Sequence, residues 1–178
     1  MFFIGICGAS CSGKSTLAKL LSERLGERCI HLRQDNYYID QSPLPFEERC
    51  KVNYDDPDIF EHDALLADVT ALKEGRSITS KGYDYAEHRR SDPGEEIKPA
   101  DVVIVEGIHA FFDPRLREMM DTKVYIQVDS DVCLLRRIKR DIRDRGRDVP
   151  SITAQYLATV KPMLDKYIRA YAQHADII

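Results

Sequence analysis

The chain has 178 residues, which suits one domain, and a domain of this size buries roughly two thirds of its unfolded surface. Its 26 Lys and Arg are fewer than its 30 Asp and Glu, and the net charge of -4 offers no broad basic surface, which argues against nucleic acid as a partner. The five cysteines are an odd number, lie far apart and form no C-x-x-C pair, so the sequence indicates neither a disulfide framework nor a zinc site.

The N-terminus shows no targeting signal. Residues 1–6 are too short for a signal peptide and lack its charged start, and no apolar run in the chain approaches the length that spans a membrane. We therefore expect a soluble, cytoplasmic protein with no membrane partner, and a reducing cytosol suits its cysteines.

The first half of the chain predicts two strand and helix pairs. Residues 2–6 form a short apolar run that ends in glycine-rich sequence, and residues 14–25 carry leucines at helical spacing. Residues 28–32 predict a second strand, and residues 63–74 predict a second helix that Gly75 ends.

The second half continues the alternation. Residues 101–105 are a continuous apolar run of the kind that is buried on both faces of a parallel sheet. Asp113 predicts a helix cap, with Pro114 in the first turn. The other predicted elements are that short helix through Met120, a strand at 123–128, helices at 129–145 and 151–172, the latter kinked by Pro162, and the start of a strand at 175–178.

Strands that alternate with helices predict an α/β fold, in which a parallel sheet carries helices on both faces and binds ligands at the carboxyl ends of its strands. No linker or internal repeat divides residues 1–178, so we expect one domain. Residues 36–58 and 76–99 are irregular and rich in aromatic residues, and we interpret them as a small substrate-covering insertion.

The strongest motif is a glycine-rich loop. Residues 8–15 match G-x-x-x-x-G-K-[ST] between a predicted strand and a predicted helix, which is the context that a phosphate-binding P-loop needs. Backbone N–H groups would hold the β-phosphate, Lys14 would reach the β and γ oxygens as a catalytic cation, and Ser15 would bind Mg²⁺. The alternative is a glycine-rich turn that binds nothing. The residues predicted to bind the nucleotide are Gly8, Ala9, Ser10, Cys11, Ser12, Gly13, Lys14, Ser15 and Thr16.

Glu106 directly follows the predicted strand at 101–105. The sheet would therefore place its carboxylate beside the P-loop, where it could hold Mg²⁺ through water. The alternative is an ordinary acidic residue at a strand end. The position at this edge of the sheet favours the metal role.

Seven sequence blocks follow one another along nearly the whole chain. The blocks are GASCSGKST at 8–16, QDNYY at 34–38, NYDDPDIF at 53–60, YDYAEHRR at 83–90, VVIVEGI at 102–108, RRIKRDIRDRGRD at 136–148 and QYLATVKPM at 155–163. The first block is shared by many nucleotide-binding proteins, whereas the ordered set is specific and resembles the uridine kinase (uridine-cytidine kinase) family. The resemblance implies a P-loop kinase, ATP or GTP as donor, Mg²⁺, transfer to the 5'-hydroxyl of uridine or cytidine in pyrimidine salvage, and often a homotetramer.

The resemblance places the catalytic base on Asp35, in the QDNYY block. The chemistry agrees, because phosphoryl transfer needs a carboxylate that accepts the hydroxyl proton and positions the nucleophile near the metal. Asp35 also follows a predicted strand, on the same sheet edge as the P-loop. The alternative is a plain loop aspartate or a helix cap.

The resemblance also implies a nucleoside site in the two insertion segments. It places sugar binding on Asp55, whose carboxylate can accept hydrogen bonds from two vicinal hydroxyls, with Tyr38 helping to hold it. Tyrosines in such insertions are often simply packed, which is the alternative reading of the base site. Base recognition falls on Tyr83 and His88, with Tyr54 and Tyr85 as candidate stacking walls.

Six arginines lie on and just after one predicted helix. We expect Leu135, Ile138 and Ile142 to form the buried stripe of this helix, which leaves the arginines on neighbouring surface. Such a charge run usually means a solvated face, but guanidinium groups here could instead bind phosphates. The six are Arg136, Arg137, Arg140, Arg143, Arg145 and Arg147.

Gly146 breaks the predicted helix inside this run, which makes residues 143–150 a candidate lid over the transferred phosphate. The resemblance assigns Arg137 and Gln155 to the nucleoside, Arg140 and Arg145 to the triphosphate, and Arg147 to the base side.

Three features depart from the family pattern. Asp56 stands where the family usually has histidine, and its charge could raise the pKa of Asp55. His109 replaces an aliphatic residue, and the resulting EGIH resembles the phosphoribulokinase branch; we interpret this histidine as a packing or hydrogen-bonding residue. Relatives continue beyond the position of Ile178 by about one sheet edge and helix, so we expect a truncated chain or an absent tail.

Two rival functions remain open. A related P-loop kinase could act on another acceptor, as phosphoribulokinase-like or pantothenate-kinase-like proteins do, although Tyr83 with His88 argues against this. A nucleotide-dependent switch or non-catalytic nucleotide-binding module would leave Asp35 idle, and the Asn-Lys-x-Asp guanine motif of GTPase switches is absent.

Overall fold

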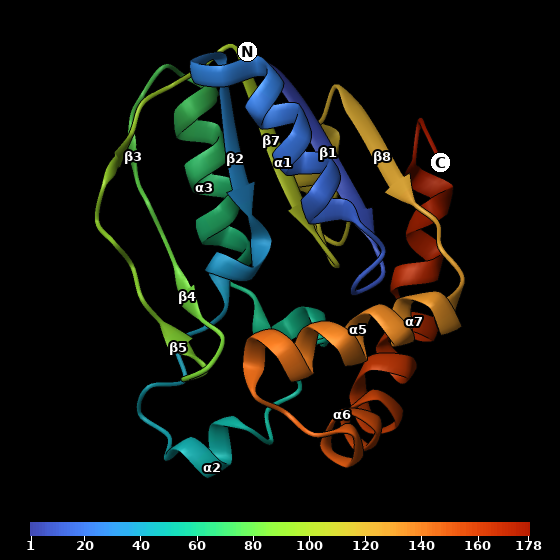
Figure 1. Ribbon diagram of the computed structural model, residues 1–178. Helices are drawn as coiled ribbons and strands as arrows, with labels where there is room; N and C mark the ends of the chain where they lie inside the picture. Colours follow the sequence, from blue (N-terminus) through green and yellow to red (C-terminus); the bar gives the residue numbers. More distant parts are fainter.

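The computed structural model describes residues 1–178 and has a four-stranded sheet at its centre (Figure 1). The strands, in spatial order, are β2 (Cys29–Arg33), β7 (Val102–Gly107), β1 (Phe2–Gly8) and β8 (Thr122–Ile126). All neighbours are parallel, and Ile4 of β1 lies opposite both Ile104 and Thr122. The carboxyl ends of all four strands therefore share one edge, which in Figure 1 faces α5 (Ser130–Arg145).

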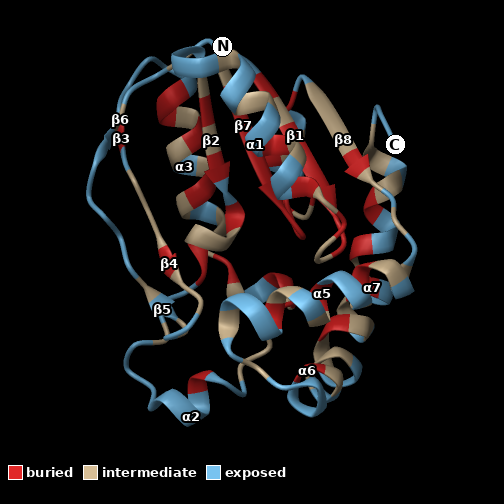
Figure 2. Ribbon diagram, viewed as in Figure 1, coloured by how far each residue is buried: buried red, intermediate tan, exposed pale blue.

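Alternation along the strands sends side chains into two separate cores. Ile6 and Ile104 pack in a small cluster with Ala18 of the first helix. Phe3 and Val103 belong to the main core, which the helices of the other face complete. Figure 2 shows the strands buried between helices whose outer sides are exposed, so the predicted parallel sheet with helices on both faces is confirmed. The helices involved are α1 (Lys14–Leu25) for the small cluster, and α3 (His62–Lys73) and α4 (Pro114–Glu118) for the main core.

The capping signals of the sequence appear in the structure. Asp113 precedes α4, and its carboxylate accepts a hydrogen bond from the backbone N–H of Arg115 at 2.9 Å. Pro114 occupies the first turn, where its missing N–H leaves no helical bond unmade. Helix α1 has the predicted ends, and Gly26 follows it with a left-handed φ of 59°.

The helix predicted over residues 151–172, with a kink at Pro162, is confirmed in part, because the segment is helical but changes its helix type along its length. The segment consists of four shorter pieces, and a widened π-helical turn ends just before Pro162. Because proline has no N–H and its ring crowds the carbonyl four residues earlier, the regular α-helical ladder cannot continue through this point. The pieces are α6 (Val149–Gln155), the π turn Tyr156–Val160, α7 (Lys161–Lys166) and a 3-10 segment Ile168–His174.

The predicted buried stripe of α5 is also wrong. Leu135 and Ile142 are 60% and 46% exposed, whereas Arg137 and Asp141 are almost fully buried. The helix lies across the carboxyl ends of the strands instead of against a sheet face (Figure 1), so its inward side meets polar groups of the P-loop, the Ser12 carbonyl and the Ser10 hydroxyl. Leu135 and Ile142 point outward from this helix.

The two insertion segments, residues 36–58 and 76–99, follow β2 and α3 along the chain. The second forms two antiparallel strand pairs, and Arg90 ties it to the start of α3 through a 2.7 Å ion pair with Glu61. A further ion pair joins Lys81 to Asp68 of α3. The elements are α2 (Phe46–Arg49), β3 (Ile78–Thr79), β4 (Tyr83–Asp84), β5 (Arg89–Arg90) and β6 (Glu96–Ile97), with 3-10 turns at Gly26–Arg28, Gln34–Tyr37 and Pro57–Ile59.

The C-terminal residues run beside β8, as the sequence predicts. Ile177 forms a parallel bridge to Val124, and its carbonyl accepts a 2.8 Å hydrogen bond from the backbone N–H of Tyr125. The fold contains no helix that combines the length and the apolar character needed to cross a membrane.

Candidate active site

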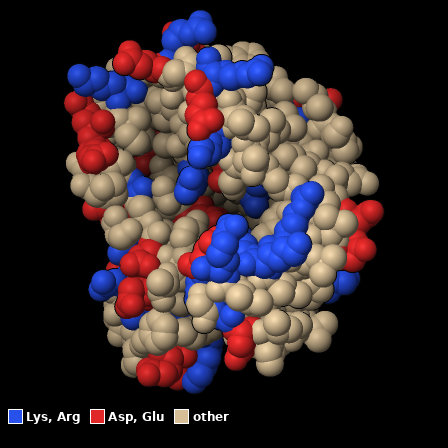
Figure 3. All heavy atoms as spheres, in the orientation of Figure 1, with Lys and Arg blue, Asp and Glu red and all other residues tan.

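A cavity of about 1240 Å³ opens at the carboxyl ends of the strands. Its wall includes the regions where all four strands end: Ser10 after β1, Asp35 after β2, Ile108 after β7 and Ile126 at the end of β8. Figure 3 shows the hollow, with basic side chains gathered along its lower edge. The predicted site residues that line it are residues 10–16, Asp35, Tyr38, Asp55, Tyr83, His88, Arg137, Arg140, Arg145, Arg147 and Gln155.

The P-loop turns between β1 and α1 with a geometry that requires glycine. A Cβ atom on Gly8 would lie 2.7 Å from the carbonyl oxygen of Ile126, so no side chain fits there. Gly13 has φ 110° at the start of α1. Gly8 and Ala9 do not line the cavity themselves, and Lys14 extends beneath the loop with its Nζ 3.5 Å from the carbonyl oxygen of Ala9.

Glu106, the predicted metal residue on β7, lies below the cavity wall. Its carboxylate is buried, with Oε1 3.8 Å from Nε2 of His31 on the neighbouring strand. Burial raises the pKa of Glu106, but the interactions with His31, Lys14 and Ser15 outweigh it and hold the pKa below its usual value. The structure thus brings an ionised carboxylate to the first turn of α1, where Ser15 lies.

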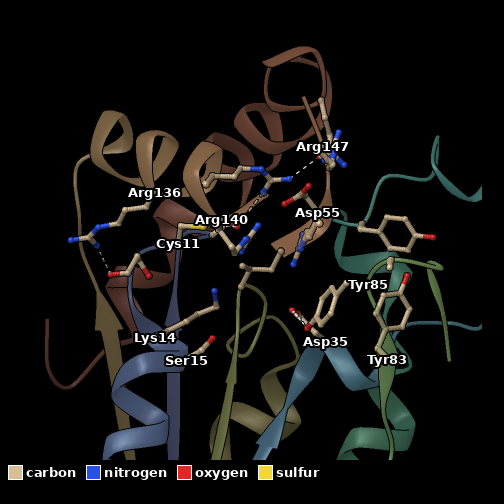
Figure 4. A pocket seen from close by; sticks show the side chains of 18 of the residues that line it. Cys11, Lys14, Ser15, Asp35, Asp55, Tyr83, Tyr85, Arg136, Arg140 and Arg147 are labelled. Carbon is tan, nitrogen blue, oxygen red and sulfur yellow. Dashed lines mark hydrogen bonds between the residues drawn. The ribbon is translucent and has the colours of Figure 1, made fainter. Parts of the chain in front are cut away.

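Asp35 stands at the end of β2, half-buried in the cavity wall. In Figure 4 its side chain, which follows β2, and that of Lys14 at the start of α1 are directed toward the same space. Removal from water and the charge of Glu106 raise the pKa of Asp35, and Lys14 opposes this. The Asp35 carboxylate accepts a hydrogen bond from the Tyr85 hydroxyl at 2.9 Å.

Asp55, the residue predicted to bind the sugar, is buried in another part of the cavity wall. Burial raises its pKa, with Arg137 opposing and Asp35 adding to the rise. The sequence suggests that the charge of Asp56 raises this pKa, but Asp56 is not among the causes of the shift. The Asp56 carboxylate accepts a hydrogen bond from the backbone N–H of Asp58. Tyr38 forms no hydrogen bond with the Asp55 carboxylate; its hydroxyl donates to the preceding carbonyl, that of Tyr54, at 3.2 Å.

His109 supports Asp55 from behind and confirms the expected hydrogen-bonding role. Its Nε2 lies 2.7 Å from the backbone carbonyl oxygen of Asp55, and its Nδ1 lies 2.9 Å from the Tyr171 hydroxyl. Burial lowers the pKa of His109 to about 4, so the ring is neutral near pH 7. A neutral ring can donate to the carbonyl through Nε2 and accept from tyrosine through Nδ1.

The aromatic residues of the insertion form one connected wall. His88 stacks on Tyr54 with ring centroids 5.0 Å apart and planes 20° apart, and it has a left-handed φ of 50°. Burial and three nearby arginines, Arg145, Arg147 and Arg49, lower the pKa of His88, which favours a neutral ring. Tyr83 is buried against Tyr38 and Tyr85, so packing is part of its environment, and it also lines the cavity.

The arginines of α5 separate into two groups. Arg143 pairs with Asp144 on the exposed side and does not line the cavity. Arg136 and Arg137 reach the P-loop, where they donate to the Ser12 carbonyl at 3.3 Å and to the Ser10 hydroxyl at 3.1 Å. The solvated-face reading is therefore wrong for the side of α5 that faces the cavity.

Asp141 is the site residue that sequence reasoning missed. It is fully buried, and guanidinium groups of Arg137, Arg140, Arg145 and Arg147 lie within 3.7 Å of its carboxylate. Its backbone carbonyl also accepts hydrogen bonds from the N–H groups that follow α5. The spacing of four residues from Arg137 to Asp141 and again to Arg145 places all three on one helix face, and this signal was available in the sequence.

Gln155 of α6 joins the arginines from the other side of the lid segment. Its Oε1 accepts a hydrogen bond from Arg137 at 2.9 Å and another from Arg147. Arg147 additionally donates to the Ser151 hydroxyl at 2.8 Å. These bonds connect the two helices across residues 143–150.

Comparison with known proteins places the chain in a family. The family model described as "Phosphoribulokinase / Uridine kinase family" matches residues 3–178. A protein named uridine kinase from Clostridium botulinum (strain Kyoto / Type A2) is 46% identical over 98% of this chain and 85% of its own length. One of the same name from Ligilactobacillus salivarius is 44% identical over 98% of this chain and 83% of its own.

Solved structures support the fold. The crystal structure of a putative fructose transport system kinase from Silicibacter sp. TM1040 superimposes with a TM-score of 0.78, covering 99% of this chain and 88% of that one, at 22% sequence identity. Identity at that level bears on the fold alone. The match of the family model over almost the whole chain, on a fold that carries the P-loop at the edge the sequence predicts, shows that the chain belongs to the phosphoribulokinase / uridine kinase family.

Proposed function

We propose that the protein is a nucleoside kinase that transfers the γ-phosphate of ATP or GTP to the 5'-hydroxyl of uridine or cytidine, a reaction of pyrimidine salvage. The observation that carries the proposal is that Lys14, at the start of α1, and the half-buried Asp35, after β2, line one cavity. The relatives of 44–46% identity are named uridine kinase, which supports a pyrimidine nucleoside as the acceptor.

The residues beside the P-loop fit a bound Mg²⁺. Ser15 offers a hydroxyl and Glu106 an ionised carboxylate, and no group of three His, Cys, Asp or Glu that could cage a metal occurs in the structure. Mg²⁺ is usually held by one or two carboxylates together with substrate phosphates, so a small donor set suits it. When bound, Mg²⁺ would neutralise charge on the β- and γ-phosphates.

In the proposed step, Asp35 accepts the proton of the acceptor hydroxyl while the hydroxyl oxygen attacks the γ-phosphorus. A new O–P bond forms, the bond from the γ-phosphorus to the bridging oxygen breaks, and its electron pair leaves with the nucleoside diphosphate. Lys14, with Arg140 and Arg145, stabilises the charge on the phosphate in transit. The lid, residues 143–150, carries Arg145 to that phosphate.

The nucleoside would lie between Asp55 and the aromatic wall. Two acceptor oxygens on Asp55 suit the vicinal hydroxyls of ribose, and the His88 ring, stacked on Tyr54, suits contact with the edge of a planar base. A flat aromatic wall offers little to a sugar phosphate, which favours a nucleoside over the acceptor of a phosphoribulokinase. The further residues proposed for the nucleoside are Tyr38, Tyr83, Arg137, Arg147 and Gln155.

A panel of acceptors tests this function. Uridine, cytidine, adenosine, ribulose 5-phosphate and pantothenate are each incubated with the protein, ATP and Mg²⁺, and the product masses are measured. We expect a gain of one phosphate on uridine or cytidine. A gain on ribulose 5-phosphate or pantothenate instead would assign a different acceptor, and no gain on any compound would favour a nucleotide-binding module without transfer.

His88→Ala should weaken the use of pyrimidine nucleosides selectively. Loss of one neutral hydrogen bond and one ring contact predicts a fall of about 10-fold in kcat/KM for uridine and cytidine. The KM for ATP should stay unchanged, because His88 packs on Tyr54 in the insertion and is not part of the P-loop. Steady-state kinetics measure both values, with His174→Ala, outside the cavity, as the matched histidine control. An equal fall for uridine, cytidine and adenosine would place base recognition elsewhere.

The assembly and the location of the protein are further parts of the proposal. The family resemblance implies a homotetramer, and the residues suit a cytoplasmic enzyme. Sedimentation of the pure protein measures its oligomeric state directly.

A further inference from the structure

The two carboxylate oxygens of Asp35 have different environments. Oδ2 accepts the hydrogen bond from Tyr85, whereas Oδ1 has no partner in the protein and is not among the buried side-chain atoms that lack one. Asp35 lines the cavity, so Oδ1 is the oxygen left available to a ligand bound there. A carboxylate base needs one free oxygen to accept the proton, and a hydrogen bond to its other oxygen fixes the orientation of the carboxylate.

Tyr85 is itself held in place from two sides. Its ring meets Tyr83 edge-to-face with centroids 5.3 Å apart, and the guanidinium carbon of Arg145 lies 4.6 Å from its ring centroid. Burial and the neighbouring Asp35 raise the pKa of Tyr85, so the hydroxyl keeps its proton and acts as a donor. Tyr85 follows β4 in the insertion, whereas Arg145 belongs to the lid and Asp35 follows a sheet strand.

We propose that Tyr85 is a positioning residue for the catalytic base: its hydroxyl holds Oδ2 of Asp35 so that Oδ1 faces the acceptor hydroxyl, and its ring supports Arg145 of the lid. This role differs from the stacking wall that the sequence suggests for Tyr85. It rests on the proposed kinase function, because it assigns a role to a residue that acts through Asp35. Tyr85 thereby links the substrate insertion, the base and the lid at one point.

Tyr85→Phe removes the one atom that makes this bond and keeps the ring under Arg145. We expect kcat for uridine to fall about 10- to 100-fold, the loss expected for a hydrogen bond to a charged group. The KM values for uridine and ATP should change less than 3-fold, because the bond orients the base and contacts neither substrate. The melting temperature, measured beside the kinetics, shows whether the variant is folded.

The matched control is Tyr37→Phe. The Tyr37 hydroxyl also donates to an aspartate at 2.9 Å, but that aspartate is Asp68 of α3, and Tyr37 does not line the cavity. This variant removes the same kind of bond without touching the base, so its kcat should stay within 2-fold of the unmodified protein. A fall in kcat equal to that of Tyr85→Phe would overturn the positioning role, since general destabilisation would then explain both.

A double-mutant cycle with Asp35→Asn separates this inference from the proposed function. If Tyr85 acts through Asp35, then Tyr85→Phe should lower kcat less than 2-fold once the base is already an amide. A full 10-fold fall in that background would overturn the inference. If Asp35→Asn abolishes transfer while Tyr85→Phe leaves kcat unchanged, the function stands and the positioning role fails. If Asp35→Asn leaves kcat unchanged, the base assignment fails with it.

Discussion

Asp35→Asn should lower kcat for uridine phosphorylation by about 10²- to 10⁴-fold, the range that a positioned general base contributes. The amide keeps the size of the carboxylate and can still accept the Tyr85 hydrogen bond, but it cannot take up the proton of the acceptor hydroxyl. The Kd for ATP should change little, because the P-loop holds the phosphates from another strand end. Single-turnover phosphorylation and ATP titration measure the two quantities.

The pH dependence of kcat provides a second readout for the same assignment. Removal from water and the charge of Glu106 raise the pKa of Asp35, so the ionised base is lost as pH falls through a value above the ordinary aspartate pKa. The unmodified protein should therefore lose kcat on its acid side, and the residual rate of Asp35→Asn should not follow that limb. Asp63→Asn, an exposed aspartate on α3, is the control. A rate for Asp35→Asn near that of the unmodified protein would refute the base assignment.

Lys14→Ala should lower kcat by about 10²- to 10³-fold or more, comparable to the loss of a preorganised transition-state donor. The Lys14 ammonium is buried beneath the P-loop, where its charge is poorly screened and acts strongly on the transferred phosphate. ATP binding should weaken as well, because the same cation contacts the β- and γ-phosphates in the ground state. Rates of uridine phosphorylation and the Kd for ATP, measured with Mg²⁺ present, test both effects.

Lys19→Ala is the matched control for this prediction. Lys19 lies on the same helix, α1, but its side chain is 68% exposed and pairs only with Glu23 at 3.6 Å. An exposed pair of this kind contributes little to stability, so the variant should keep its activity. If Lys14→Ala retained turnover within 10-fold of Lys19→Ala, the P-loop lysine would not be the catalytic cation.

Local patterns in the sequence determined most of the secondary structure and the P-loop. The eight residues of the loop are contiguous, so their spacing already implies the strand, turn and helix that hold them. The Asp113-Pro114 cap is likewise readable because its partner, the N–H of Arg115, is two residues away. The continuous apolar run of β7 required a buried position on both faces, and the sheet provides it.

The prediction from hydrophobic periodicity failed for a helix that buries charged residues and exposes apolar ones. Helix α5 turns Arg137 and Asp141 inward because the P-loop at the carboxyl edge of the sheet presents polar groups to it, such as the Ser10 hydroxyl that accepts from Arg137. An apolar stripe such as that of Leu135 predicts burial only when the helix packs against an apolar face. The kink predicted at Pro162 is present as a π-helical turn, but the sequence marks a break there without determining which irregular form the helix takes.

Contacts between distant segments were decided only by the tertiary structure. The hydrogen bond from Tyr85 to Asp35 joins residues 50 positions apart, and that from His109 to the Asp55 carbonyl joins residues 54 apart. The sequence determines which residue types are available and which short-range elements form, because those depend on neighbours along the chain. Which oxygen of Asp35 stays free and which arginines share Asp141 depend on how strands, insertion and lid pack together, and spacing along the chain does not encode that packing.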